Sequence, residues 1–296
     1  MAKLKANSIS IEYEEFGPKN GPVILLIMGL GAQLTRWPVE FIANLTERGY
    51  RVVRHDNRDV GLSQKFDVAG VPQIAQMMAD AAQGKKISAA YSLDDMADDA
   101  AGLLAALGIG RAHIVGASMG GMIAQLVAAH HPDQTISLTS IMSSTGNPEL
   151  PPAKPEAMAV LMTRPPANDL QAIIDSSVKA SRVIGSPAYP ADEKTLRANA
   201  ERDVKRSNYP AGFARQMAAV VVCGDRRSEL KKITAPTLVI HGLDDPLVPV
   251  QGGRDTAANI KGAQLLEIPG MGHDLPVELY RQIADAITGH ASSAGS

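Results

Sequence analysis

The sequence predicts an α/β fold in which a mostly parallel sheet is covered by helices on both faces. Short, almost wholly apolar runs that are typical of buried strands recur along the chain, as at 23–28, 112–115 and 237–241. Segments with apolar residues at helical spacing lie between these runs. Strands that alternate with helices imply right-handed crossovers, and such crossovers build a parallel sheet that is buried on both faces.

The first elements indicate one edge strand followed by buried ones. Residues 8–13 alternate between polar and apolar types, which predicts a half-exposed strand at the edge of the sheet. The apolar run 23–28 predicts a central strand, and 51–55 predicts another buried one. A helix is expected from Phe41 to Arg48, because apolar residues recur at helical spacing there and Gly49 ends the pattern.

Two more helices are expected before the strand at 112–115. A short helix is predicted at 74–82. The next helix begins at the N-cap Ser92, with Asp95 three residues further on, and runs to about Leu107. The helix at 74–82 lies in a small excursion from the alternating pattern, between Ser63 and Tyr91.

One stretch, 147–222, breaks this alternation. Six prolines cluster in its first part, and helical patterns then recur without clear strands. We therefore expect a helical cap at 147–222, inserted into an α/β core formed by 1–146 and 223–290. A chain of 296 residues is long enough for such a core and cap. Residues 291–296 are small and polar, so a disordered tail is expected there.

Composition and charge argue against several classes of protein. Hydrophobic residues make up 45% of the chain and charged residues 20%, as in ordinary globular enzymes. A formal net charge of -2 gives no general field for nucleic acid or an anionic membrane, so neither partner is expected. We expect neither a signal peptide nor a membrane span. The single Cys223 cannot form an internal disulfide, which favours a cytoplasmic location.

The strongest functional signal is the motif Gly-Ala-Ser-Met-Gly at 116–120, between the strand 112–115 and a helix-forming run at 122–130. A serine on this sharp strand-to-helix turn is held in a strained conformation, and the glycines on either side let the backbones pass closely. The turn also places the N–H of Met119 at a helix N-terminus, where developing negative charge is favoured. Ser118 is therefore the predicted nucleophile.

A serine hydroxyl needs a base, and after a serine of this motif the acid and the histidine follow along the chain. His273 lies in a glycine-rich loop after the predicted strand 264–268 and is the expected base. The turn-rich loop after 237–241 contains two adjacent aspartates, Asp244 and Asp245. Neighbouring residues on an extended chain point to opposite sides, so only one of the two faces the imidazole.

Together these motifs resemble the α/β-hydrolase superfamily across nearly the whole chain outside the cap. The acid loop of that superfamily, Gly-x-x-Asp-x-x-Val-Pro, fits residues 242–249, and the match implies that Asp245 orients the base. Its oxyanion loop fits residues 28–31, which implies that the backbone N–H groups of Leu30 and Met119 form the oxyanion hole.

Two residues depart from the superfamily pattern. Met28 replaces the usual histidine before the oxyanion glycine, and Asp59 replaces the first glycine of the segment Asp-x-Arg-Gly-x-Gly-x-Ser. Together with Arg-Trp-Pro at 36–38 and the loop 269–276, these departures resemble the carboxylesterase branch that contains aclacinomycin methylesterase. The resemblance implies a small-molecule ester as substrate.

The predicted function is therefore hydrolysis of a carboxylic ester by a Ser118–His273–Asp245 triad through an acyl-enzyme intermediate. A lactonase, a carbon–carbon bond hydrolase or a cofactor-free perhydrolase would use the same triad, and a non-catalytic ligand-binding receptor would use the same fold. No complete dinucleotide fingerprint, Walker lysine or zinc-spaced Cys/His set occurs, so no cofactor and no metal are expected. The oligomeric state is not predicted.

The apolar residues of the expected cap have two interpretations. They would either line an apolar substrate pocket or pack the cap on itself. These residues are Met158, Met162, Ile173, Ile174, Val178 and Met217.

Overall fold

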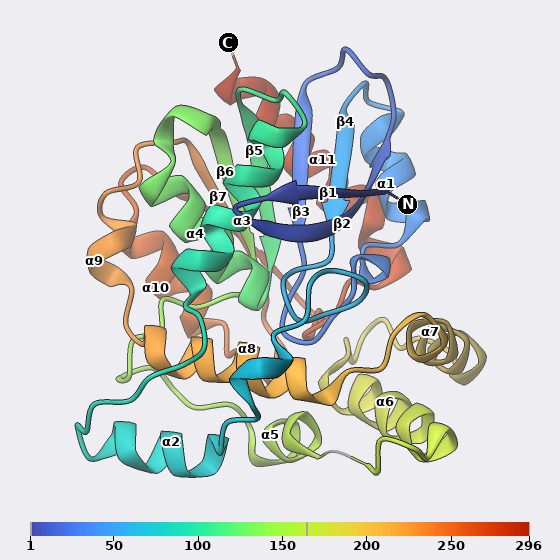
Figure 1. Ribbon diagram of the computed structural model, residues 1–296. Coiled ribbons are helices and arrows are strands. Elements are labelled where there is room, and N and C mark those ends of the chain that lie inside the picture. Colours follow the sequence, from blue (N-terminus) through green and yellow to red (C-terminus); the bar gives the residue numbers. More distant parts are fainter. Residues whose placement is uncertain (1, 164, 296) are drawn as a thin grey trace.

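In the computed structural model, which describes residues 2–163 and 165–295, eight strands form one mostly parallel sheet (Figure 1). The strands are β1 (Ala2–Ala6), β2 (Ile9–Phe16), β3 (Val23–Ile27), β4 (Arg51–His55), β5 (Ala112–Ala117), β6 (Thr135–Ile141), β7 (Thr237–Gly242) and β8 (Gln264–Ile268). Their order across the sheet is β1-β2-β4-β3-β5-β6-β7-β8. Strand β2 runs antiparallel to β1 and β4, and all other neighbours pair in parallel.

Helices cover both faces of the sheet, which confirms the predicted fold class. They are α1 (Val39–Thr46), α2 (Ile74–Ala82), α3 (Leu93–Ala106), α4 (Met119–His130), α5 (Pro155–Met162), α6 (Leu170–Ile184), α7 (Glu193–Arg206), α8 (Pro210–Cys223), α9 (Arg227–Leu230), α10 (Gln251–Asn259) and α11 (Tyr280–Ala294). On β3, Leu25 and Ile27 pack with α3 and α4, whereas Ile24 and Leu26 pack with α1 and α11. Burial on both faces explains why this strand is apolar throughout.

The edge of the sheet differs from the prediction. Strand β1 was not expected, and it forms the edge, so that β2 lies between β1 and β4. Its lysines are exposed, and charged side chains on an outer strand discourage pairing with other chains. Strand β6 was also missed, because its polar residues hide its burial: Ser137 lies 2.9 Å from His113 Nδ1, and Ser140 accepts a hydrogen bond from Gln125.

Helices α5 to α8 occupy the segment that was expected to form a cap. Figure 1 shows α8 between the sheet and the pair α2 and α5. The division of the chain into separate core and cap units stays a prediction. No helix among residues 2–163 and 165–295 combines the length and the apolar character needed to cross a bilayer.

The prediction of a disordered tail at 291–296 is wrong for most of its length. Helix α11 continues to Ala294, and Ala291 is buried in the same core cluster as Ile283 and Ile287. These three residues recur at intervals of four, so Ala291 continues the inner face of a helix that is already packed. Ser296 lies outside the described residues.

Buried histidine makes the stability of this fold depend on pH. His55 ends β4 and is 1% exposed, and burial lowers its pKa from 6.5 to about 4. Between these values the unfolded chain binds a proton that the folded protein does not, so the free energy of unfolding decreases as the pH falls. We expect this group alone to remove about 2 kcal/mol between pH 7 and pH 5.

Urea denaturation of the wild type and of His55→Gln at both pH values measures this contribution. Other groups titrate in both proteins, including His113, whose pKa is also lowered to about 4 by burial. Their contributions to the change in stability therefore cancel when the two proteins are compared. The variant should lose about 2 kcal/mol less than the wild type over this interval, whatever its stability at pH 7. Equal losses would show that His55 does not titrate as its burial implies.

Candidate active site

Ser118 lies on the turn between β5 and α4 in a strained conformation, as predicted. Its φ of 57° and ψ of -124° are unfavourable for a residue with a Cβ. Four hydrogen bonds hold this backbone: Ser118 N–H donates to Ile141 O (2.9 Å), and Ser118 O accepts from Gly121 N and Ser143 Oγ (both 2.9 Å) and from Met122 N (3.2 Å). The surrounding structure therefore imposes a geometry that the residue alone would avoid.

The two glycines of the motif are required by close backbone contacts. A Cβ on Gly116 would lie 2.0 Å from Gly120 O, and a Cβ on Gly120 would lie 2.2 Å from Ile27 O. Distances this short are not tolerated between non-bonded atoms. The N-terminus of α4 therefore packs directly against the ends of β5 and β3.

The structure brings the three predicted catalytic side chains together from distant loops. His273 Nε2 lies 2.9 Å from Ser118 Oγ, and His273 Nδ1 lies 2.7 Å from Asp245 Oδ2. An ionised carboxylate only accepts hydrogen bonds, so Nδ1 carries the imidazole proton in this arrangement. The lone pair of Nε2 then faces the serine hydroxyl, as a general base requires.

The two adjacent aspartates have different environments. Asp245 is 5% exposed, and its Oδ1 accepts hydrogen bonds from Leu247 N (2.9 Å) and Val248 N (2.8 Å). Asp244 is exposed and accepts a hydrogen bond from Gly270 N (2.8 Å). Asp245 thus faces the imidazole, while Asp244 braces the start of the histidine loop.

A second imidazole, His241, lies beside the acid. Its Nε2 is 3.7 Å from Asp245 Oδ2 and donates a hydrogen bond to Val248 O at 2.7 Å. Burial lowers the pKa of His241, which keeps this ring neutral near pH 7. His241 therefore packs against the carboxylate without adding a positive charge beside it.

The predicted oxyanion loop passes close to the nucleophile. Ala32 N–H donates to Gly29 O at 3.2 Å, and Gly31 has a φ of 64°, which together describe a β-turn that needs positive φ at its third residue. A Cβ on Gly29 would lie 3.0 Å from Ser118 Cβ. Met119 is the first residue of α4, where a backbone N–H has no partner within the helix. The roles of Leu30 and Met119 as oxyanion donors stay predictions.

Comparison with known families matches residues 22–278 to the alpha/beta hydrolase fold family. The chain belongs to this family. The match confirms the resemblance that the motifs indicated.

Relatives and solved structures span nearly the whole chain. Rhodomycin D methylesterase DauP of Streptomyces sp. (strain C5) is 27% identical, covering 97% of each chain. Bifunctional esterase/perhydrolase DCH of Acinetobacter calcoaceticus is 26% identical, covering 91% of each chain. The enol-lactonase of Burkholderia xenovorans LB400 has the same fold, with a TM-score of 0.74 at 24% identity, over 98% of this chain and 100% of its own.

Asp59, which departs from the superfamily pattern, forms a buried ion pair with α8. It has a φ of 68° at a position where glycine is usual, and it accepts hydrogen bonds from Arg215 at 2.7 and 2.9 Å and from Tyr91 Oη at 2.8 Å. Burial opposes the charge, but these donors hold the pKa of Asp59 below its ordinary value. Sequence reasoning noted Asp59 and missed its partner.

The histidine loop is held by the last residue of α6 and by the linker that follows this helix. His273 N–H donates to Ile184 O at 2.7 Å, and Gly272 N–H donates to Ser186 Oγ at 2.9 Å. The Ser186 hydroxyl donates in turn to the Asp274 carboxylate. Burial raises the pKa of Asp274. The position of the predicted base therefore depends on contacts that no local motif indicates.

Three of the apolar residues of the expected cap pack in two different places, and the choice between a pocket lining and a packed cap stays a prediction. Met217 belongs to a cluster with Phe213 and Leu30, so it packs against the oxyanion loop. Ile174 and Val178 pack with α7 and hold the helices α6 and α7 to each other.

Among the described residues, no group of three or more His, Cys, Asp or Glu side chains is placed to hold a metal ion.

Proposed function

We propose that this hydrolase cleaves small-molecule carboxylic esters with Ser118 as nucleophile, His273 as base and Asp245 as the acid that orients the base. The proposal is carried by one observation, the continuous chain of hydrogen bonds from Asp245 Oδ2 through both imidazole nitrogens to Ser118 Oγ. The names of the relatives, a methylesterase and an esterase/perhydrolase, support an ester as substrate.

In the first half of the proposed reaction, Ser118 Oγ attacks the ester carbonyl carbon while its proton moves to His273 Nε2. The carbonyl π electrons move to the oxygen, and the N–H groups of Leu30 and Met119 stabilise that negative charge. The C–O bond to the alcohol then breaks, and the alcohol leaves with the proton from Nε2. The acyl group remains on Ser118, and Asp245 stays ionised beside the imidazolium.

In the second half, water attacks the acyl carbonyl while His273 takes a proton from it. The bond to Ser118 Oγ breaks, Oγ regains the proton, and a carboxylic acid is released. Hydrogen peroxide attacking in place of water would give a peracid, so perhydrolysis is a second candidate activity. The esterase/perhydrolase relative from Acinetobacter calcoaceticus supports it.

The apolar side chains around the oxyanion loop favour an ester with an apolar group. Leu30, the proposed oxyanion residue, packs against a cluster formed by Ile74 of α2 and by Met217 and Ala218 of α8. Burying apolar substrate surface against such side chains is favourable by roughly 25 cal/mol per Å². Longer acyl chains should therefore lower KM until they no longer fit.

The proposal is tested by measuring turnover of p-nitrophenyl acetate, butyrate and octanoate. A methyl ester, a lactone and an assay for peracid formation are measured beside them. We expect release of p-nitrophenolate, and stoichiometric inactivation by a reactive phosphonate with the added mass on the peptide that contains Ser118. The opposite result is that the ester raises the melting temperature while no phenolate is released. The protein would then be a ligand-binding receptor, and the hydrolase proposal would fail.

A further inference from the structure

One buried side chain of α8 contacts the oxyanion loop directly. Gln216 is 0% exposed, its Oε1 accepts a hydrogen bond from Gly31 N–H at 2.8 Å, and its Nε2 donates to Arg58 O at 2.7 Å. Because the amide accepts at one end and donates at the other, its orientation is fixed. The ion pair of the neighbouring Arg215 with Asp59 independently holds α8 in place.

The Gly31 N–H belongs to the central peptide of the turn from Gly29 to Ala32. Turns of this kind exist in two forms that differ by a flip of the central peptide, and the flip changes φ of the third residue from positive to negative. Gly31 tolerates either form, because glycine has no Cβ. The turn sequence therefore does not fix the peptide, and the acceptor on Gln216 is the contact that selects the observed form.

The flip would change the chemistry of the loop. It moves the Leu30 carbonyl oxygen to the side where the Gly31 N–H now lies, and it changes ψ of Leu30 by about 150° while φ of Leu30 stays the same. Oxyanion stabilisation requires N–H donors that already point at the developing charge. The Leu30 N–H lies in the preceding peptide, which the flip itself leaves in place. Without the tether on the Gly31 N–H, however, Leu30 is held from one side only, and its N–H loses part of this preorganisation.

We propose that Gln216 is a positioning residue for the oxyanion hole: it holds the Gly31 N–H and thereby fixes the turn that presents the Leu30 N–H. This inference rests on the proposed ester hydrolysis and adds to it a dependence of catalysis on α8. Gln216 does not touch the reacting atoms, and its effect passes through the turn.

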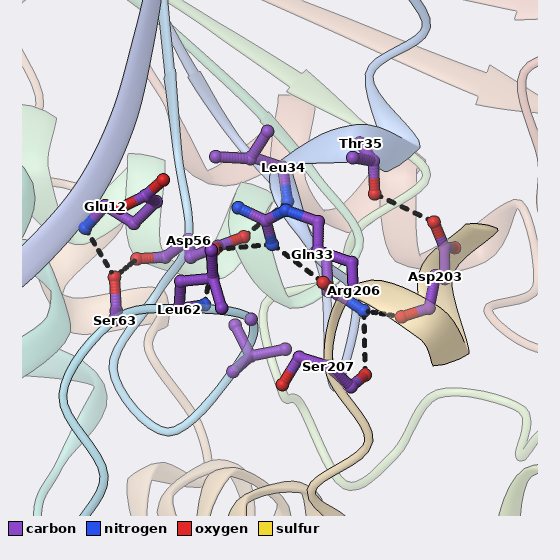
Figure 2. Close-up of polar contacts among 12 residues, drawn as sticks. Glu12, Gln33, Leu34, Thr35, Asp56, Leu62, Ser63, Asp203, Arg206 and Ser207 are labelled. Carbon is purple, nitrogen blue, oxygen red and sulfur yellow. Dashed lines mark hydrogen bonds and ion pairs between the residues drawn. The ribbon is translucent and has the colours of Figure 1, made fainter. Parts of the chain in front are cut away.

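The rest of the loop is anchored by separate contacts, which Figure 2 shows. Asp56 accepts a hydrogen bond from Leu34 N–H at 2.8 Å and pairs with Arg206 Nη1 at 2.8 Å. Gln33 accepts from Arg206 at 2.7 Å and donates to Asp203 O at 2.6 Å. Loss of Gln216 should therefore release the turn while the following residues stay in place.

Steady-state kinetics of Gln216→Met with a p-nitrophenyl ester tests the inference. Methionine has a similar volume and no amide. We expect kcat to fall about 10- to 100-fold with KM changed less than about threefold, since complete loss of one oxyanion donor costs about 10²–10³. Gln216→Glu keeps an acceptor for the Gly31 N–H. The logarithm of its kcat loss should be smaller than that of Gln216→Met by at least about a third.

A reversible trifluoromethyl ketone inhibitor, whose serine adduct carries an oxyanion, gives a second reading. Its inhibition constant should rise in Gln216→Met by the same factor as kcat/KM falls, because the adduct resembles the transition state. The matched control is Gln125→Met, which removes another wholly buried glutamine amide, one that donates to Ser140 and not to the loop. This control should lose stability and keep its affinity for the inhibitor.

Each outcome decides the inference. Wild-type kcat and inhibitor affinity in Gln216→Met, or equal losses in Gln125→Met, would overturn it. If Gln216→Met does not fold, Gln216→Asn replaces it, because its shorter side chain retains an amide that no longer reaches Gly31, and the same kinetic loss is expected. A wild type that cleaves no ester would overturn the proposed function, which is a separate result.

Discussion

Replacing Ser118 with alanine is expected to lower kcat/KM for p-nitrophenyl esters by at least about 10⁴-fold and to abolish the burst of phenolate release. The variant lacks the oxygen that forms the acyl-enzyme, whereas His273 and Asp245 keep their own hydrogen bond. Residual activity would come from the oxyanion donors and substrate binding alone. Stopped-flow absorbance over the first turnover, followed by steady-state rates, measures both effects.

The fold of this variant should be almost unchanged, because the four hydrogen bonds made by the Ser118 backbone do not use its hydroxyl. A melting temperature within a few degrees of the wild type would exclude unfolding as the cause of inactivity. Ser137→Ala, which removes a buried hydroxyl near His113, is the matched control and should keep full activity. A burst that survives in Ser118→Ala would mean that another group is the nucleophile.

The fold could be predicted where the signal is local. An apolar run followed by Gly-Ala-Ser-Met-Gly and a helix-forming segment identifies β5, the turn and α4, because each feature lies within about one element. Strand β1 and the end of α11 were missed, since neither is apolar enough to be noticed alone. Ala291 is buried only because Ile283 and Ile287 already face the core.

The site could be predicted as far as its motifs extend. The motif around Ser118 and the loops that carry Asp245 and His273 are short local patterns, and the fold brings them together. The supporting residues have no such pattern: Gln216 contacts Gly31 across 185 positions, and Arg215 contacts Asp59 across 156. The identity of such partners depends on how α8 packs, which one sequence does not specify.

The choice between the adjacent aspartates is tested by replacing each one with asparagine. Asp245→Asn should lower kcat by about 10⁴-fold, because the neutral amide no longer holds the proton on His273 Nδ1 or stabilises the imidazolium. Asp244→Asn should stay within about threefold of the wild type, because its amide oxygen still accepts the hydrogen bond from Gly270 N. Each variant differs from the wild type only in that one carboxylate oxygen becomes an amide NH2 group, and the two positions are neighbours. A general effect of the lost charge would therefore appear in both variants.

Rates measured with saturating p-nitrophenyl ester, together with melting temperatures, separate the two roles. Asp245 is buried and accepts two backbone hydrogen bonds besides that of His273, so its replacement should also lower stability. Comparison at a temperature where both variants are fully folded removes that effect from the rates. A large loss of kcat in Asp244→Asn with normal activity in Asp245→Asn would reverse the assignment of the acid, since only the residue that touches the imidazole can control its proton.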